Sequence, residues 1–186
     1  LLILFRGVGK RPRSWQAVGA GVLTGFFLFS GYVLQTLGLR LTTAPKSAFL
    51  TGLTSVMVPL LGSIVYRTRP QASEVVGVLV ATVGLGLMTL EGAVWAIGRG
   101  DLLTLLGAVA FAARIVSVSH FSRHMSFELL SVSQIGAAAL LALSLFWWAE
   151  TPAADWQPVV LYAILITGLL ATALAFAIQA WAQRYT

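Results

Sequence analysis

The chain has no cysteine and few charged residues, which make up 10% of its 186 positions. Without cysteine it can form neither disulfides nor zinc–thiolate sites, and it has no thiol nucleophile. Soluble domains are about 25% charged and about 45–50% apolar, whereas this chain is 58% apolar with a mean hydropathy of +0.89. The composition excludes an ordinary soluble enzyme and places most of the chain in a lipid bilayer.

Motifs for phosphate binding and metal chemistry are missing as well. The segment Gly7–Lys10 lacks the first glycine and the hydroxyl of a phosphate-binding loop, so we expect no ATP coupling within this chain. His120, His124 and Glu128 are spaced for one helix face, but they cross the end of an apolar stretch, and Arg123 would repel a cation. We predict a polar turn there, with no catalytic residue, no metal site and no cofactor.

The net charge of +6 comes from basic residues that stand singly or in short groups between long uncharged runs. This is the pattern of membrane loops rather than of a nucleic-acid-binding surface, so we expect no nucleic-acid partner. Scored by alternate loops, eight basic residues lie on one side of the membrane and three on the other. The side with eight, which includes the bases after residue 5, is predicted to be cytoplasmic.

Uncharged stretches of membrane-spanning length indicate an all-α membrane protein, a helical bundle. Spanning strands would show about 10 residues of alternating character, and no stretch alternates for long. The apolar residues 1–5, followed by bases, resemble the exit of an earlier span, and we expect this chain to be an internal part of a longer protein. Six complete spans are predicted at 15–39, 46–66, 74–93, 101–122, 127–149 and 158–183.

Two segments of the chain match each other across five predicted crossings. Residues 32–42 align with residues 176–186, with Gln, Arg and Thr at the same spacing and an aromatic residue three positions before each Gln. An odd number of crossings reverses direction, so the two copies would be inverted, as in many secondary transporters. Chance, or a shared chemistry of helix ends, remains the alternative.

Polar residues inside the predicted spans are the best guide to function, because they cost free energy in lipid unless they are paired or face a cavity. Small and polar residues share one face in three spans, either as helix contacts or as the lining of a pathway. Pro59 interrupts the backbone bonding of its span, as a plain kink or as a hinge. The residues on these faces are Gly21, Gly25, Tyr32 and Gln35; Ser47, Thr51, Ser55 and Gly62; and Gly168, Thr172, Phe176, Gln179 and Gln183.

Arg114 is the single residue that points most clearly to a function, because it is a charged residue deep inside a predicted span. It lies roughly 3–4 Å from the centre of its span at 1.5 Å per residue. An arginine at that depth costs at least about 2.5–3.5 kcal/mol, and no carboxylate of the chain falls at a comparable depth. It therefore either serves a pathway or a substrate, or is bonded structurally.

The order of several short segments resembles the EamA group of the drug/metabolite transporter superfamily. No single segment is diagnostic, but together they cover nearly the whole chain. They are Gly31–Arg40, Thr42–Leu53, Val58–Gly62, Gly84–Met88, Gly100–Leu103 with Ala110–Ala112, Ala171–Phe176 and Gln179–Arg184.

The resemblance implies a ten-helix inverted-repeat transporter. Residues 1–93 would be the C-terminal part of the first repeat, with the end of helix 2 and helices 3 to 5. Residues 100–186 would be the N-terminal part of the second repeat, with helices 6 to 8. It further implies a multi-pass protein of the bacterial inner membrane whose central cavity is lined by Tyr32, Gln35, Ser47, Thr51, Arg114, Phe176 and Gln179.

The function predicted from these features is secondary transport, as an exporter or exchanger of small metabolites or drugs by alternating access. Arg114 departs from the uncharged residue typical of that family and points to an anionic or zwitterionic solute. The alternatives are a non-transporting membrane scaffold, which would show no saturable flux, and an intramembrane enzyme, which would need a nucleophile–base or metal cluster. The expected partners are therefore a small-molecule solute and the lipid bilayer. The sequence does not decide whether the protein forms a homodimer.

Overall fold

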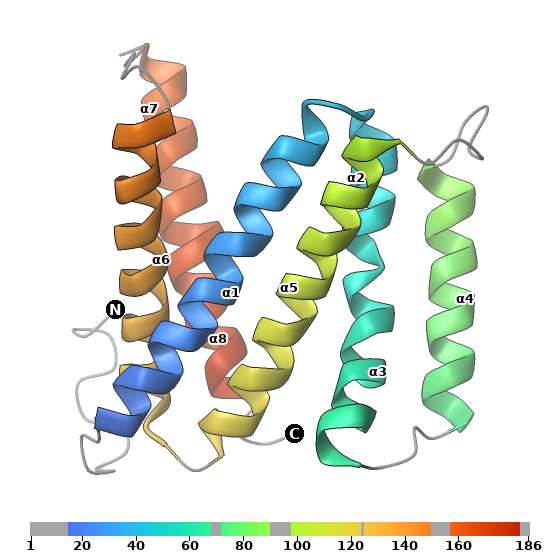
Figure 1. Cartoon of the computed structure of the whole chain (residues 1–186), viewed down its shortest axis with the longest axis horizontal. Helices are drawn as coiled ribbons and strands as arrows, with labels where there is room; N and C mark the ends of the chain where they lie inside the picture. The colour runs from blue at the N-terminus through green and yellow to red at the C-terminus, as the bar shows by residue number, and fades with distance from the viewer. Residues whose placement is uncertain (1–14, 68–71, 90–97, 124, 150–156, 183–186) are drawn as a thin grey trace. The chain divides into compact units, whose positions relative to one another are not determined.

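The computed structural model describes residues 15–67, 72–89, 98–123, 125–149 and 157–182, and within these ranges it is almost entirely helical and has no strand (Figure 1). The predicted all-α class is confirmed. The helices are α1 (Trp15–Leu39), α2 (Ala44–Gly52), α3 (Thr54–Tyr66), α4 (Ala72–Thr89), α5 (Arg99–Ser122), α6 (Phe127–Ala149), α7 (Pro158–Leu165), the π-helix η1 (Ile166–Leu174) and α8 (Ala175–Ala182).

Four of the described stretches are long and apolar enough to cross a membrane. They are Trp15–Leu39, Ala44–Tyr66, Arg99–Ser122 and Glu128–Phe146. Val75–Gly84 and Pro158–Leu169 are shorter apolar helices, at the places where two further spans were predicted. The multi-span membrane architecture is thus supported, and six complete spans remain a prediction.

Helix ends follow local chemistry. Pro45 and Pro158 occupy the first turns of α2 and α7, where a missing N–H is tolerated. Helix α3 ends at Arg67, whose backbone is left-handed with φ 52° and ψ 34°. The carbonyl of Gly98 accepts the N–H of Leu102 at 3.2 Å and so begins α5.

The predicted span 46–66 is divided at Leu53, which ends α2 and begins α3. Beside this break the Thr54 hydroxyl donates to the carbonyl of Thr51 at 2.6 Å, and the Ser55 hydroxyl donates to the carbonyl of Gly52 at 2.8 Å. Such hydroxyls satisfy carbonyls at interruptions inside membranes. Helix α3 continues through Pro59, so the interruption lies before the proline that the sequence marked.

The predicted continuous helix at 158–183 is also divided, because residues 166–174 form the π-helix η1 between α7 and α8. Within η1 the Thr172 hydroxyl donates to the carbonyl of Thr167 at 2.8 Å. Its wider turn takes one more residue per hydrogen-bonded ring than an α-helix, and such turns are rare and often found at functional sites. A 3.6-residue periodicity in the sequence gives no sign of this change.

The chain folds as two compact units. The first contains α1 up to Phe29 and the chain from Ser117 onward. Its core is built from Ala20, Val118 and Leu130, and α6 lies beside α8 (Figure 1). Helix α1 packs on α6 closely at Gly25, where an added Cβ would lie 2.8 Å from the Cβ of Ala137.

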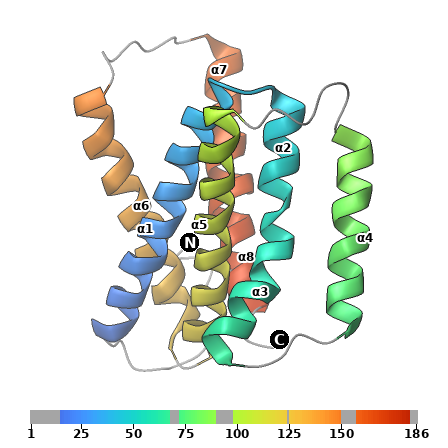
Figure 2. The same cartoon turned by 45° about the vertical axis from the view of Figure 1, so that its right-hand side comes forward.

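The second unit runs from Ser30 to Val116. Its helices α2 and α3 follow each other end to end, and α4 packs beside both of them, as the two views show (Figures 1 and 2). The last turns of α1 pack against the first part of α5 with almost no space between the backbones. An added Cβ at Gly100 would lie 2.7 Å from Leu41, and one at Gly107 would lie 3.1 Å from the carbonyl oxygen of Gly31. Close approach of this kind is typical of helix pairs in membranes.

Candidate functional site

Five of the seven predicted pathway residues fall in the second unit. Tyr32 and Gln35 are on α1, Ser47 and Thr51 are on α2, and Arg114 is on α5. The other two predicted residues, Phe176 and Gln179, are on α8 in the first unit. The structure therefore places most of the predicted set on three helices of one compact unit.

Gln35 and Thr51 form the most direct contact within this set. The Gln35 amide donates from Nε2 to the Thr51 hydroxyl at 2.9 Å, which joins α1 to the last turn of α2. The Thr54 hydroxyl follows at the break between α2 and α3 and lies 3.4 Å from the carbonyl oxygen of Ala108 on α5. These polar groups connect α1, α2, α3 and α5 inside otherwise apolar helices.

Tyr32 and Phe111 pack edge to face, with ring centroids 5.3 Å apart and planes inclined by 79°. This is a favoured geometry for aromatic pairs. Gly31 makes room for it, because an added Cβ there would come within 2.6 Å of the Phe111 ring. Tyr32 keeps 43% of its surface exposed beside this contact.

Arg114 is buried, with 3% of its surface exposed. It lies inside the span Arg99–Ser122, in the same unit as Tyr32. The predicted burial of a cation within an apolar helix is therefore found. Together with the amide, the hydroxyls and the phenol, this cation supplies groups that can bind a polar or anionic solute without covalent chemistry.

Ser47 is the buried residue of α2, at 4% exposure. Its backbone N–H donates to the carbonyl of Thr43 at 2.9 Å in the first turn of the helix. Ser47 and Thr51 are four residues apart and share one face of α2. That face meets α1 through Thr51, so the predicted polar stripe of this helix points into the second unit.

In the first unit, α8 carries two of the predicted residues and α6 carries further buried polar residues. Phe176 and Gln179 follow the π-helix and are half-buried. Gln134 and Ser131 on α6 are buried, at 0% and 1% exposure. Within the described part of the chain, no group of three or more His, Cys, Asp or Glu side chains could hold a metal ion.

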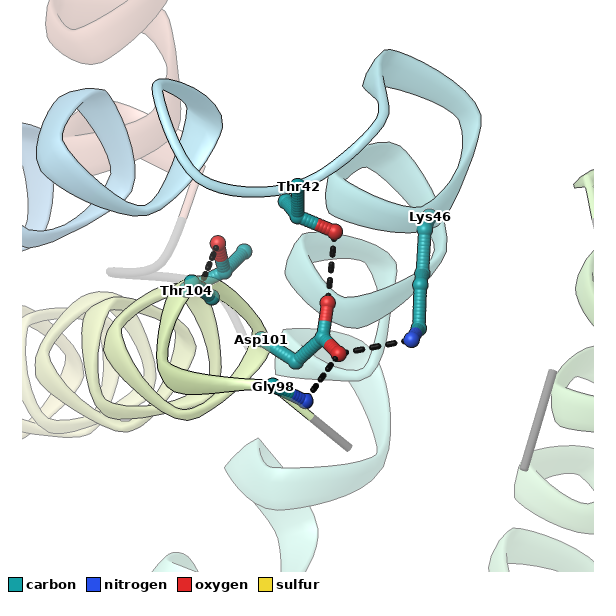
Figure 3. A network of polar contacts seen from close by, with 6 residues as sticks. Thr42, Lys46, Gly98, Asp101 and Thr104 are labelled. Carbon is teal, nitrogen blue, oxygen red and sulfur yellow. Dashed lines mark hydrogen bonds and ion pairs between the residues drawn. The ribbon is translucent and has the colours of Figure 1, made fainter. Parts of the chain in front are cut away.

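One polar cluster was not predicted from the sequence. Asp101, in the first turn of α5, is 4% exposed and lies between Thr42 and Lys46 (Figure 3). The Thr42 hydroxyl donates to Oδ1 at 2.6 Å, and Lys46 Nζ lies 2.6 Å from Oδ2. The available signal was that Lys46 and Asp101 carry opposite charges on the same predicted side of the membrane.

Comparison with known proteins assigns residues 1–90 to the EamA-like transporter family. The chain is 33% identical over 166 residues to an uncharacterized transporter of Archaeoglobus fulgidus, covering 89% of this chain and 53% of that protein. It is 28% identical over 158 residues to the uncharacterized transporter YetK of Bacillus subtilis, covering 78% of this chain and 47% of YetK.

A third relative, the uncharacterized transporter YyaM of Bacillus subtilis, is 27% identical over 154 residues, which cover 78% of this chain and 50% of YyaM. The chain thus spans about half the length of the curated relatives it matches. No solved structure gave a significant match. The match of residues 1–90 to the EamA-like transporter family, together with the relatives, confirms the resemblance predicted from the sequence.

Proposed function

We propose that this chain forms part of a secondary transporter that moves small metabolites or drugs across the bacterial inner membrane by alternating access, as an exporter or exchanger. The proposed whole protein has ten helices in two inverted halves. In this arrangement, residues 1–93 complete the first half and residues 100–186 open the second. The family match and the apolar helices support a multi-pass membrane transporter, and the finer mechanism is the proposal.

The observation that carries the proposal is the buried Arg114. An arginine inside a spanning helix costs free energy that a purely structural helix avoids by using an apolar residue. Phe111 lies three residues before Arg114 on α5, one helical turn away, and packs edge to face on Tyr32 of α1. A site that combines a cation with a phenol and an aromatic face suits a small organic anion or zwitterion.

The polar contact between Gln35 and Thr51 supports the same site. Both side chains keep further hydrogen-bonding capacity, because an amide has two donors and an acceptor and a hydroxyl has two lone pairs. They lie on the two helices that also carry Tyr32 and Ser47. In the proposed cycle Phe176 and Gln179, on α8, line the pathway contributed by the second half.

The test is uptake and efflux of a mixed metabolite pool by proteoliposomes that contain the full-length protein. We expect saturable flux of an anionic or zwitterionic solute. Replacement of Arg114 by alanine should weaken the apparent affinity for that solute at least about tenfold, because a hydrogen bond to a charged group contributes about 1.5–3 kcal/mol. Arg114→Lys keeps the charge and should retain part of the flux.

Arg123→Ala is the matched control, since Arg123 is an exposed arginine just beyond the end of α5. Equal losses for the alanine variants of Arg114 and Arg123, in protein that elutes as folded material, would contradict the site. Absence of saturable flux for every solute would contradict transport and favour a membrane scaffold.

A further inference from the structure

The Asp101 carboxylate accepts from three donors that come from three segments of the second unit. Gly98 donates its backbone N–H to Oδ2 at 2.8 Å, just ahead of α5. Thr42, in the connection between α1 and α2, donates to Oδ1 at 2.6 Å. Lys46, in the first turn of α2, completes the set as an ion pair at 2.6 Å (Figure 3).

The contact with Gly98 alone would account for Asp101 as a helix-capping residue. Gly98 begins α5, and a carboxylate three residues later that accepts its N–H is half of a capping box. A negative charge there also interacts favourably with the helix dipole. Capping, however, requires neither Thr42 nor Lys46, and both belong to other segments of the chain.

Lys46 ties α5 to the short helix α2. Helix α2 has nine residues and ends at the interruption at Leu53. It carries Lys46 in its first turn and the proposed pathway residues Ser47 and Thr51 beyond it. The segment is therefore held at one end by the ion pair with Asp101 and joined to α3 at the other end through a break in the helix.

We propose that the Lys46–Asp101 ion pair is a gate bond, which holds α2 on α5 in the state shown and breaks when the polar site opens toward that end of the helices. The distribution of basic residues predicts that this end is the non-cytoplasmic one. The proposal rests on the proposed transport function and adds to it the location of one gate. The moving part is α2, and the break at Leu53 is its hinge.

The two partners are placed differently with respect to solvent, which makes the bond breakable. The Lys46 side chain is 21% exposed, whereas the Asp101 side chain is 5% exposed. Lysine can extend its flexible stem into water at the membrane surface. Asp101 would then keep the donors Thr42 and Gly98, so opening leaves no buried carboxylate without hydrogen bonds.

The experiment measures access to α2 from the end where it begins. Ser47, at 4% exposure, is replaced by cysteine in the full-length protein, in which cysteines outside this cysteine-free chain are changed to serine. The proteoliposomes are treated with a membrane-impermeant maleimide, and the labelling rate is measured. We expect slow labelling of Ser47→Cys by itself.

Breaking the ion pair should raise the labelling rate. Asp101→Asn and Lys46→Gln, each added to Ser47→Cys, should accelerate labelling by about tenfold or more, because a charge-assisted hydrogen bond can shift an opening equilibrium by that factor. The double variant Lys46→Gln with Asp101→Asn should label no faster than the faster of the two single variants, because either substitution alone already removes the ion pair. Arg99→Gln is the matched control, an exposed cation at the same helix end, and should leave the rate unchanged.

Unchanged labelling in both Asp101→Asn and Lys46→Gln would overturn the gate and leave a static cap. Additive acceleration in the double variant would also overturn it, because Lys46 and Asp101 would then act independently of each other. Lys46→Gln keeps the test decisive if Asp101→Asn fails to fold, since it leaves the cap of α5 in place. Labelling needs no solute, so loss of flux with the expected labelling pattern counts against the transport proposal only.

Discussion

The second unit has a tight side, where α1 packs on α5, and an open side, formed by α3 and α4. Glycine has a different role on each side. On the tight side, where α1 meets α5, an added Cβ at Gly38 would lie 2.7 Å from the carbonyl oxygen of Gly100. On the open side, Gly62 of α3 and Gly77 and Gly84 of α4 have nothing within 4 Å of such a Cβ. On the tight side glycine is needed because a larger residue would clash, whereas on the open side an added Cβ would meet no neighbouring atom among the described residues.

The polar contacts lie between these two sides. Gln35 on α1 bonds Thr51 on α2, and Asp101 on α5 pairs with Lys46 on α2. Each contact joins a helix of the tight pair to the short helix α2. Because the tight pair has no free space to change its spacing, movement within this unit is expected at α2 and its break, where the links are a few polar bonds.

The largest effect is expected from adding one methyl group at Gly38. Gly38→Ala should lower the free energy of unfolding by about 1–3 kcal/mol, as overpacking does in well-packed cores. The new Cβ would meet the backbone of Gly100 as well as Thr104, and a backbone cannot move aside as a side chain can. Thermal denaturation of the detergent-solubilised full-length protein, followed by size-exclusion chromatography, measures this.

Gly62→Ala is the matched variant on the open side. It should leave stability unchanged or raise it by up to about 1 kcal/mol, because alanine is the better helix former. If Gly38→Ala and Gly62→Ala have effects of the same sign and size, the distinction between a tight and an open side is wrong.

A medium effect is expected for the hydrogen bond between Gln35 and Thr51, which joins α1 to α2. In a double-mutant cycle with Gln35→Ala and Thr51→Val, the coupling energy should be about 0.6 kcal/mol and at most about 1.7 kcal/mol, the range of hydrogen bonds between membrane helices. The same cycle applied to solute affinity tests whether the pair also binds the solute. If the effects of the two substitutions are strictly additive on both stability and solute affinity, the Gln35–Thr51 hydrogen bond contributes to neither.

The smallest effect is expected from a hydroxyl that, among the described contacts of α4, bonds only within its own helix. Thr82 on α4 donates to the carbonyl of Val78 in its own helix at 2.8 Å. Thr82→Ala should change stability by no more than about 0.5 kcal/mol, as is usual for substitutions away from tertiary contacts. A larger loss in the thermal assay, or a loss of flux, would show that the open side carries polar function too.

Most helices could be located from the sequence, because a membrane helix appears there as a long uncharged stretch. The predicted ranges 15–39, 101–122 and 127–149 correspond to α1, α5 and α6 within two residues. The interruption at Leu53 and the π-helix η1 were missed, since neither depends on a marked residue. Backbone hydrogen bonding changes at both, and at Leu53 the serine and threonine that satisfy the freed carbonyls are also ordinary helix residues in lipid.

The candidate site was predictable to the extent that polar residues inside lipid are costly. On that ground Arg114, Gln35 and Thr51 were predicted, and the structure adds the bond between the last two. Phe111 was not predicted, because it is an apolar residue whose role follows from its contact with Tyr32. Lys46 and Asp101 were placed at the outer ends of two predicted spans, but their pairing was not predicted, because it depends on how α2 and α5 begin beside each other.

The sequence by itself determined the membrane environment, the helical class, the approximate bounds of α1, α5 and α6 and the family resemblance, because each of these depends on residue type and order along the chain. The tertiary structure decided which polar residues meet, where a helix is interrupted and which glycines are indispensable. Those features depend on distances between segments far apart in the chain, and a distance of 2.6 Å between Lys46 and Asp101 is set by the packing of helices rather than by any local pattern.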